Sequence, residues 1–109
     1  MLLSQLSPVA AVAEIGRLLS SPTRVAILQY LLEADCCICR DLTKMTGYAQ
    51  PTVSKHLAEL RTAGLVEATP EGTTRKYCIN AANWFHARDQ LAKFFGEQPL
   101  CCPTPSTKQ

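Results

Sequence analysis

The stretch from Gln50 to Leu65, QPTVSKHLAELRTAGL, constrains the fold of this chain more than any other segment. Its apolar residues recur at i, i+4 and i+7 and therefore line one stripe of a helix: Val53, Leu57 and Leu60. Pro51 suits the first helical turn, and Gly64 can adopt the left-handed conformation that ends a helix. The opposite side carries small polar groups and one cation, a surface that suits base-pair edges in a DNA major groove.

Two helices are predicted before this stretch. Ser21 and Pro22 are a favourable N-cap and first residue for a helix reaching about Ala34, and its apolar stripe is Val25, Leu28, Leu31 and Leu32. A shorter helix is expected over 40–46, ending at Gly47. Two helices joined by a tight turn that contains glycine, the second presenting polar residues near its start, are typical of a helix-turn-helix.

A two-stranded hairpin is predicted directly after the helix-turn-helix. Val66 to Thr69 and Arg75 to Ile79 read as strands, with the turn Pro70 to Thr74 between them and Gly72 supplying its unusual backbone angle. Such a hairpin is a wing. Its tip carries groups suited to DNA phosphates: Thr73, Thr74, Arg75 and Lys76.

Further helices are expected at both ends of the chain. The first spans Leu6 to Leu19, and the last begins after Asn83 as N-cap and reaches about Phe95. The last helix has a large apolar stripe formed by Trp84, Ala87, Leu91, Phe94 and Phe95. We expect this stripe to pair with a second subunit rather than to cover only the core of its own subunit. The fold class is therefore mainly α with a small β-hairpin, a dimeric winged helix-turn-helix of about five helices over residues 1–100, followed by a flexible cysteine-containing tail over 101–109.

Length, charge and composition exclude several classes of protein but do not identify the function. With 109 residues the chain is one domain, and its net charge of +2 permits DNA binding without proving it. No run is long enough for a membrane span and no signal peptide is expected, so we predict a cytoplasmic protein with no membrane partner. Enzyme activity is not expected, because no nucleophile–base pair, phosphate loop or acid pair stands out.

The six cysteines are the main candidates for chemistry. An even number can indicate a disulfide scaffold, but a cytosolic location and a helical pattern favour a thiolate site for a soft ion. A short extended segment is expected over Cys37, Ile38 and Cys39, with Ile38 facing the core and both thiols facing the other way. Cys36 is interpreted as a bystander.

The order of elements resembles the ArsR/SmtB family of metalloregulatory winged-helix repressors. The resemblance covers roughly residues 8–95 and rests on SSPTRVAILQYLL, CICRDL, QPTVSKHLAELRTAGLV and EGTTRKYCI. It implies a homodimer that binds operator DNA and leaves it when an inducer binds. Carried over by position, it implies DNA contacts from the helix and from the wing by Gln50, Thr52, Ser54, Lys55, His56, Arg75 and Lys76. For His56, a role in packing or phosphate contact is as compatible with the pattern as a base contact.

The resemblance also suggests an inducer, because the arsenic sensors of the family carry a Cys-x-Cys motif. Here that pair is displaced by one residue relative to Asp41-Leu42, and a third cysteine of some members is Thr43, so that site cannot be copied intact. In a winged helix the strand before the third helix pairs with the second wing strand, which would bring Cys37 or Cys39 towards Cys78. The expected ligand set includes the pair in the tail: Cys37, Cys39, Cys78, Cys101 and Cys102.

The sequence thus predicts an arsenite- or antimonite-responsive repressor of the arsenical resistance type. As(III) or Sb(III) would be bound by cysteine thiolates as inducer, with no organic cofactor. A zinc site on the last helix is a weaker match, since it offers only His86 and Asp89. Three alternatives stay open: a redox- or persulfide-sensing repressor, a cadmium or lead sensor, and, from a different class, a thiol-rich metal carrier.

Overall fold

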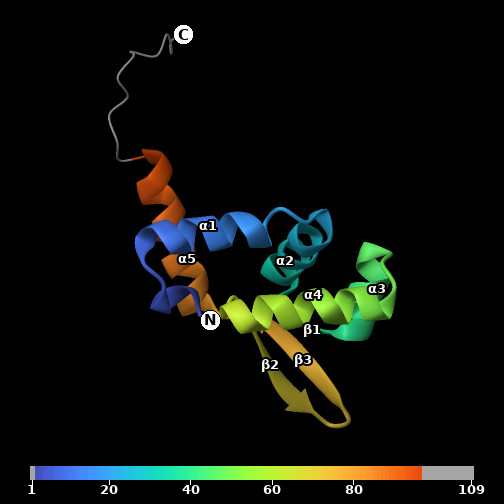
Figure 1. The fold of residues 1–109 in the computed structure, drawn as a ribbon. Coiled ribbons are helices and arrows are strands. Elements are labelled where there is room, and N and C mark those ends of the chain that lie inside the picture. The colour runs from blue at the N-terminus through green and yellow to red at the C-terminus, as the bar shows by residue number, and fades with distance from the viewer. Residues whose placement is uncertain (1, 97–109) are drawn as a thin grey trace.

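The computed structural model describes residues 2–96, which form a winged helix-turn-helix. The elements follow in the order η1 (Leu3–Gln5), α1 (Pro8–Leu18), α2 (Pro22–Ala34), β1 (Cys36–Ile38), α3 (Cys39–Thr46), α4 (Gln50–Ala63), β2 (Val66–Glu71), β3 (Thr74–Ile79) and α5 (Ala81–Gly96). In Figure 1, α1 and α5 lie at one end of the molecule, α3 lies at the other, and the β2–β3 hairpin projects below α4. The predicted fold class is confirmed, apart from its dimeric state.

The sheet has three antiparallel strands in the order β1-β3-β2. Strand β3 pairs with β2 through the hairpin, in a register that places Val66 opposite Ile79. On its other edge β3 pairs with β1, the short strand between α2 and α3. The wing, which we define as β2 and β3, is therefore joined through β1 to the helix-turn-helix formed by α3 and α4.

The predicted stripe of α4 forms the centre of the core. Val53, Leu57 and Leu60 have no exposed surface, and they pack with buried leucines and isoleucines of α1, α2 and α3. Burying such side chains contributes roughly 1.5–3 kcal/mol each, an upper estimate because the unfolded chain is already partly collapsed. The helix ends where expected, since Gly64 has φ +90° and the amide of Leu65 donates to the carbonyl of Leu60. These contacts leave the polar side of α4 facing outward.

Several boundaries differ from the prediction. Strand β2 continues to Glu71, so the turn is shorter than expected, although Gly72 does take a positive φ of +64°. Helix α5 begins at Ala81, and the side chain of Asn80 accepts a hydrogen bond from the amide of Asn83. The predicted N-cap, Asn83, instead donates its side-chain amide to the carbonyl of Gly64 at 2.8 Å and so ties α5 to the end of α4.

The two outer helices bury only part of their apolar surface. In α1 the buried residues are Ala11, Ile15 and Leu18, whereas Val9 is 83% exposed. In α5 only Ala87 is buried, and Phe95 is 76% exposed. No helix within residues 2–96 is long and apolar enough to cross a membrane. The predicted tail, 101–109, lies outside the described residues.

Candidate nucleic-acid interface

A groove lies between the helix-turn-helix and the wing. It has a volume of about 530 Å³ and is bordered by α3, α4 and β3. Its lining residues are Ile38, Cys39, Arg40, Thr43, Gln50, Ser54, Thr74, Arg75 and Tyr77. We call it the reading groove. Three of the predicted DNA-contacting residues meet there, Gln50 and Ser54 from α4 and Arg75 from the wing.

The first turns of α4 present polar atoms to this groove. Gln50 and Lys55 are exposed, and Thr52 and Ser54 are half-buried. The Nε2 of Gln50 donates to the Oγ of Ser54 at 3.5 Å, so the two side chains lie along one ridge. Amide and hydroxyl groups that both donate and accept are the kind that bind base edges. This arrangement matches the surface expected from the sequence.

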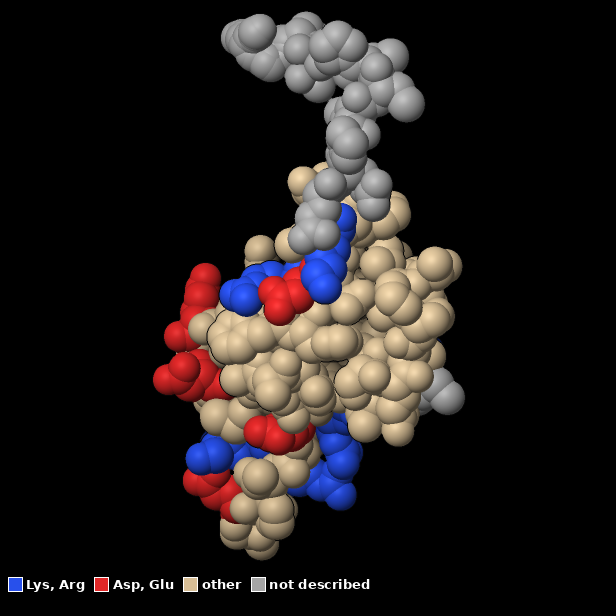
Figure 2. Space-filling view, turned by 90° about the vertical axis from the view of Figure 1, so that its left-hand side faces the viewer, with Lys and Arg blue, Asp and Glu red and all other residues tan. Residues whose placement is uncertain are grey.

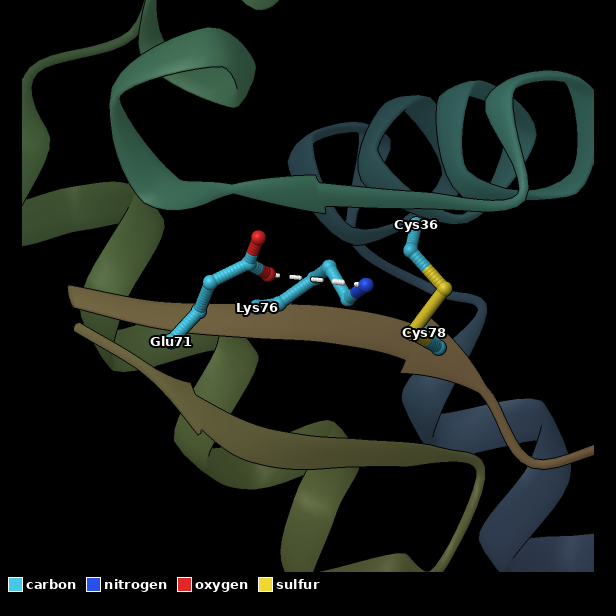
Figure 3. The surroundings of a disulfide bond; sticks show 4 residues. All are labelled: Cys36, Glu71, Lys76 and Cys78. Atoms are coloured by element: carbon cyan, nitrogen blue, oxygen red, sulfur yellow. Dashed lines mark ion pairs between the residues drawn. A yellow bond between two sulfur atoms is a disulfide. The ribbon is translucent and has the colours of Figure 1, made fainter.

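The two cations predicted in the wing are not equivalent. The Nζ of Lys76 lies 3.4 Å from a carboxylate oxygen of Glu71, which partly neutralises it (Figure 3). Arg75 is exposed, lines the reading groove and takes part in no ion pair among the residues described. Alternation along β3 places Arg75 on the helix-facing side of the strand and Lys76 on the outer side. Arg75 is therefore the better placed of the two to bind a phosphate beside α4.

His56 differs from the other predicted contacts because its ring is turned inward. Its Nδ1 lies 3.1 Å from Nη1 of Arg24 and 3.2 Å from Oε1 of Glu59, and only 17% of its side chain is exposed. Of the two roles considered for this residue, packing between α2 and α4 is the one that the geometry supports. A base contact from Nδ1 would require these neighbours to be displaced.

Arg24 holds three helices together and was not anticipated from the sequence. It is only 7% exposed; its Nε donates to the carbonyl of Leu18 at 2.7 Å and its Nη2 to the carbonyl of Arg17 at 3.0 Å. Its Nη1 also donates to Oε1 of Glu59 on α4. The guanidinium thus joins the end of α1 to α2 and α4, which fixes the orientation of the helix that borders the reading groove.

The environment of Glu59 favours its charged form. Desolvation raises the pKa of this carboxyl, but the hydrogen bond from His56, the charge of Arg24 and the hydrogen bond from Arg24 outweigh that effect. The pKa of Glu59 consequently lies below its usual range. The carboxylate remains ionised at neutral pH and keeps the contact between α2 and α4.

Arg40 is a second cation that the sequence reasoning passed over. It follows Cys39 at the start of α3, is exposed, and lines the reading groove opposite the wing. Its position in the sequence could have identified it, because it directly precedes the Asp-Leu pair at the start of the helix-turn-helix. The expected contact set treated the wing as the main source of phosphate contacts, whereas the groove has an arginine on each side.

The cysteines of the described residues are arranged differently from the prediction. Strand β1 starts at Cys36, and its register places Cys36 opposite Cys78 and Cys37 opposite Tyr77. Cys36 and Cys78 form a disulfide with a Cα–Cα distance of 4.3 Å (Figure 3). The expectation that Cys36 is a bystander and that Cys37 or Cys39 neighbours Cys78 is therefore wrong, because the strand begins one residue earlier than assumed.

The two other described thiols face different surroundings. Cys37, not Ile38, is the core-facing residue of β1, and burial, with smaller effects from Asp41 and Cys39, raises the pKa of its thiol to about 11. Cys39 begins α3, and its Sγ lies 3.5 Å from the Oγ of Ser54 in the reading groove. Cys37 and Cys39 therefore do not share one face of a strand.

A complete three-thiolate site is not formed by the described part of the chain. Among residues 2–96, no three His, Cys, Asp or Glu side chains are arranged to hold one metal ion. This includes the weakly matching pair of α5, His86 and Asp89. The predicted ligands Cys101 and Cys102 lie outside the described residues.

A separate apolar surface lies at the α1–α5 end. A cavity of about 410 Å³ is lined by Pro8, Val9, Val12, Ala13, Gln90, Lys93 and Phe94. Phe94 and Phe95 continue this surface along α5, with exposed fractions of 58% and 76%. Figure 2, which looks onto this end of the molecule, shows a broad uncharged face with charged residues gathered above, below and at one side. Exposed apolar side chains concentrated in this way mark an interaction surface.

Comparison with known proteins gives consistent matches. Residues 21–68 match the family described as bacterial regulatory protein, arsR family. The HTH-type transcriptional regulator CmtR of Mycobacterium tuberculosis is 39% identical over 88 residues, which cover 81% of this chain and 68% of that protein. A putative arsenical resistance operon repressor of Halobacterium salinarum is 39% identical over 61 residues, covering 54% of this chain and 50% of that protein. Among solved structures, an ArsR-like transcriptional regulator from Rhodococcus sp. RHA1 superposes with a TM-score of 0.67 at 28% identity, covering 79% of this chain and 80% of that one.

Proposed function

The chain belongs to the ArsR family of bacterial transcriptional regulators, and on that premise we propose that it represses transcription as a homodimer on operator DNA and is released by trivalent arsenic or antimony bound to cysteine thiolates. The regulators and folds that it resembles are DNA-binding proteins, and the chain is not an enzyme. The observation that carries the proposal is the reading groove, where Gln50, Ser54 and Arg75 meet.

The DNA-bound arrangement follows from this groove. Helix α4 would enter the major groove with Gln50, Thr52, Ser54 and Lys55 towards the bases, and Arg75 would contact a phosphate beside it. Lys76 would contribute less because it is paired with Glu71. A homodimer would place two copies of α4 about 34–36 Å apart, in successive major grooves of a two-fold operator.

A charge-matched pair of variants tests the DNA contacts. Arg75→Ala and Arg61→Ala remove the same charge, but Arg61 lies at the far end of α4, away from the reading groove. In fluorescence anisotropy titrations with the chain's own upstream DNA, Arg75→Ala should lower affinity and reduce the slope of log K against log salt by about 1 per protomer. Equal slopes for the two variants would contradict the proposed docking.

The homodimer is proposed to form through α1 and α5. These helices contact one another and leave Val9, Phe94 and Phe95 exposed around an apolar cavity. A folded chain of this size gains stability by covering such a surface with a second copy, because a small domain buries a limited core of its own.

Sedimentation velocity tests this interface with a matched control. Val9→Asp places a charge in the α1–α5 surface, whereas Met45→Asp places one on another exposed apolar residue, which is 61% exposed on α3. We expect Val9→Asp to sediment as a monomer and Met45→Asp to behave as the wild type does. Dissociation by both variants, or by neither, would count against the α1–α5 interface.

The inducer is proposed to bind thiolates that include Cys78. Similarity to a putative arsenical resistance repressor supports an arsenical, and the adjacency of Cys36 and Cys78 places two sulfurs together once their bond is reduced. Cys36 therefore joins the expected set, and Cys37 leaves it because its thiol is buried and protonated. A third sulfur for As(III) would come from Cys39, Cys101 or Cys102.

Release from DNA identifies the thiols in the reduced protein. Each cysteine is replaced singly by serine, and arsenite is titrated into the complex of each variant with operator DNA. Cys78→Ser and Cys36→Ser should need at least about tenfold more arsenite for half release, within the usual range of allosteric coupling. Cys37→Ser should respond as the wild type does, and it is the control. A normal response from Cys78→Ser would refute this assignment.

A further inference from the structure

The disulfide between Cys36 and Cys78 joins two elements that are far apart in sequence, and it lies on the outer face of the sheet. The two residues are 42 positions apart and connect β1, at the start of the helix-turn-helix, to the second strand of the wing. In Figure 3 the bond lies on the same side of the sheet as Lys76 and Glu71. Both cysteines are only half-buried, so solvent reaches this pair.

We propose that Cys36 and Cys78 are a reversible oxidation site, and that forming their disulfide leaves the operator-binding surface in place while removing Cys78 from inducer binding. This inference rests on the proposed function for its second part. The first part, which pair of thiols is oxidised, depends only on the arrangement of the cysteines.

Strand pairing explains why these two thiols react together. Antiparallel pairing of β1 with β3 already places the two residues directly opposite one another, independently of any bond between their side chains. Oxidation therefore requires no change of register. Cys37 points to the opposite face and is buried, and Cys39 begins α3 beside Ser54, so neither is a cross-strand neighbour of Cys78.

The chemistry balances with a hydroperoxide as oxidant. One thiolate attacks the peroxide, the O–O bond breaks, and a sulfenic acid forms with release of water or an alcohol. The second thiolate then attacks the sulfenic sulfur, the S–S bond forms as the S–O bond breaks, and the departing hydroxide takes up a proton and leaves as water. The two sulfurs together lose two electrons and two protons. A dithiol reductant reverses the process by thiol–disulfide exchange.

The bonded form keeps the operator-binding surface because the bond and the reading groove lie on different sides of the sheet. Cys78 and Lys76 alternate with Tyr77 and Arg75 along β3, and Tyr77 and Arg75 line the groove. The structure described here contains the disulfide, and in it Gln50 and Arg75 border one continuous groove. Oxidation should therefore make the repressor insensitive to a thiol-binding inducer without removing it from DNA.

Mass mapping of the full-length protein tests the oxidation site. The protein is reduced without oxygen, treated with one equivalent of hydrogen peroxide per chain, alkylated and digested. We expect a linked peptide pair containing Cys36 and Cys78, with Cys39 still alkylated, and loss of the link in Cys36→Ser but not in Cys39→Ser. A link between other cysteines, links between subunits, or a full set of free thiols would overturn the proposal.

Operator binding tests the consequence. The oxidised protein should bind operator DNA as the reduced protein does, while the arsenite needed for half release rises at least about tenfold and returns to the original value after dithiothreitol is added and removed. Loss of operator binding on oxidation, or an unchanged arsenite response, would refute the second part. If reduced protein is not released by arsenite, the proposed inducer fails, and the mapped link still decides the oxidation site.

Discussion

Replacing Arg24 should destabilise the protein more than replacing any exposed arginine. Its guanidinium donates to the carbonyls of Leu18 and Arg17 at the end of α1 and to the carboxylate of Glu59 on α4. Arg24→Ala removes these three bonds and the 3.1 Å contact between Nη1 and Nδ1 of His56. Hydrogen bonds that involve a charged group contribute about 1.5–3 kcal/mol each, and an unpaired buried acceptor costs about 1–3 kcal/mol.

The expected loss in the free energy of unfolding is smaller where water can replace a lost contact. About a third of the Glu59 side chain is exposed, so water replaces part of the lost ion pair, and that contribution is counted at about 1 kcal/mol. The bond to the carbonyl of Leu18 is buried and is counted in full. The bond to the carbonyl of Arg17 is only partly buried and is left out. The two counted contributions therefore give an expected loss of about 2.5–4 kcal/mol in the free energy of unfolding for Arg24→Ala, a large share of the 5–15 kcal/mol typical of a folded domain.

Arg17→Ala is the matched control, since the same change is made seven residues earlier in the chain. Arg17 pairs with Glu14 at 2.7 Å, but its side chain is 52% exposed, and such pairs contribute about 0–1 kcal/mol. Its backbone carbonyl, which Arg24 uses, is retained in this variant. Urea denaturation followed by circular dichroism measures both losses, at one protein concentration because the proposed dimerisation would contribute to stability. If the two variants lose the same stability, the role assigned to Arg24 is wrong.

Three further predictions concern single residues. Gly64→Ala should lower the free energy of unfolding by at least about 1–2 kcal/mol, because φ is +90° and an added Cβ would lie 2.8 Å from Leu2 and 2.9 Å from Asn83. The control is Gly16→Ala, where the added Cβ would meet no atom within 4 Å, and thermal melts of the two variants measure the difference. Because the pKa of Glu59 is lowered in the folded state, its contribution to stability is complete above the unfolded value of about 4.3 and is lost as the pH falls through the lower, folded value. Urea midpoints of wild type and Glu59→Gln should therefore converge as the pH is lowered through this range, and a constant gap would contradict this. Cys37, with a pKa of about 11, should be the slowest described thiol to react with iodoacetamide in the reduced native protein at neutral pH, and equal rates for all thiols would show that it is not buried.

Local patterns were sufficient to predict the elements that position the reading groove. The helical spacing of Val53, Leu57 and Leu60 identified the buried face of α4, and Gly64 identified its end. The hairpin followed from strand periodicity around a glycine turn, and Gly72 does take a positive φ. These signals depend on neighbouring residues, so they can be read without knowledge of the tertiary structure.

Contacts between distant elements could not be predicted in this way. Nothing in the residues around Arg24 shows that its side chain turns back to the end of α1 and also reaches Glu59, which is 35 positions away. The same holds for Asn83, a plausible helix cap that instead donates to the carbonyl of Gly64. In both cases several local partners were chemically suitable, and the packing of the helices selected a distant one.

The arrangement of the cysteines was predicted wrongly because the start of β1 was placed one residue too late. Side chains alternate along a strand, so a strand beginning at Cys37 would place Cys37 and Cys39 on one face, whereas the observed strand begins at Cys36 and turns Cys37 into the core. Helix α3 then starts at Cys39 and ends the alternation. The Cys-x-Cys spacing therefore brings no two sulfurs together, and the adjacent pair comes from strand pairing between Cys36 and Cys78. It follows that inducer response and oxidation should both depend on this cross-strand pair, and that Cys37, although part of the recognisable motif, should affect neither.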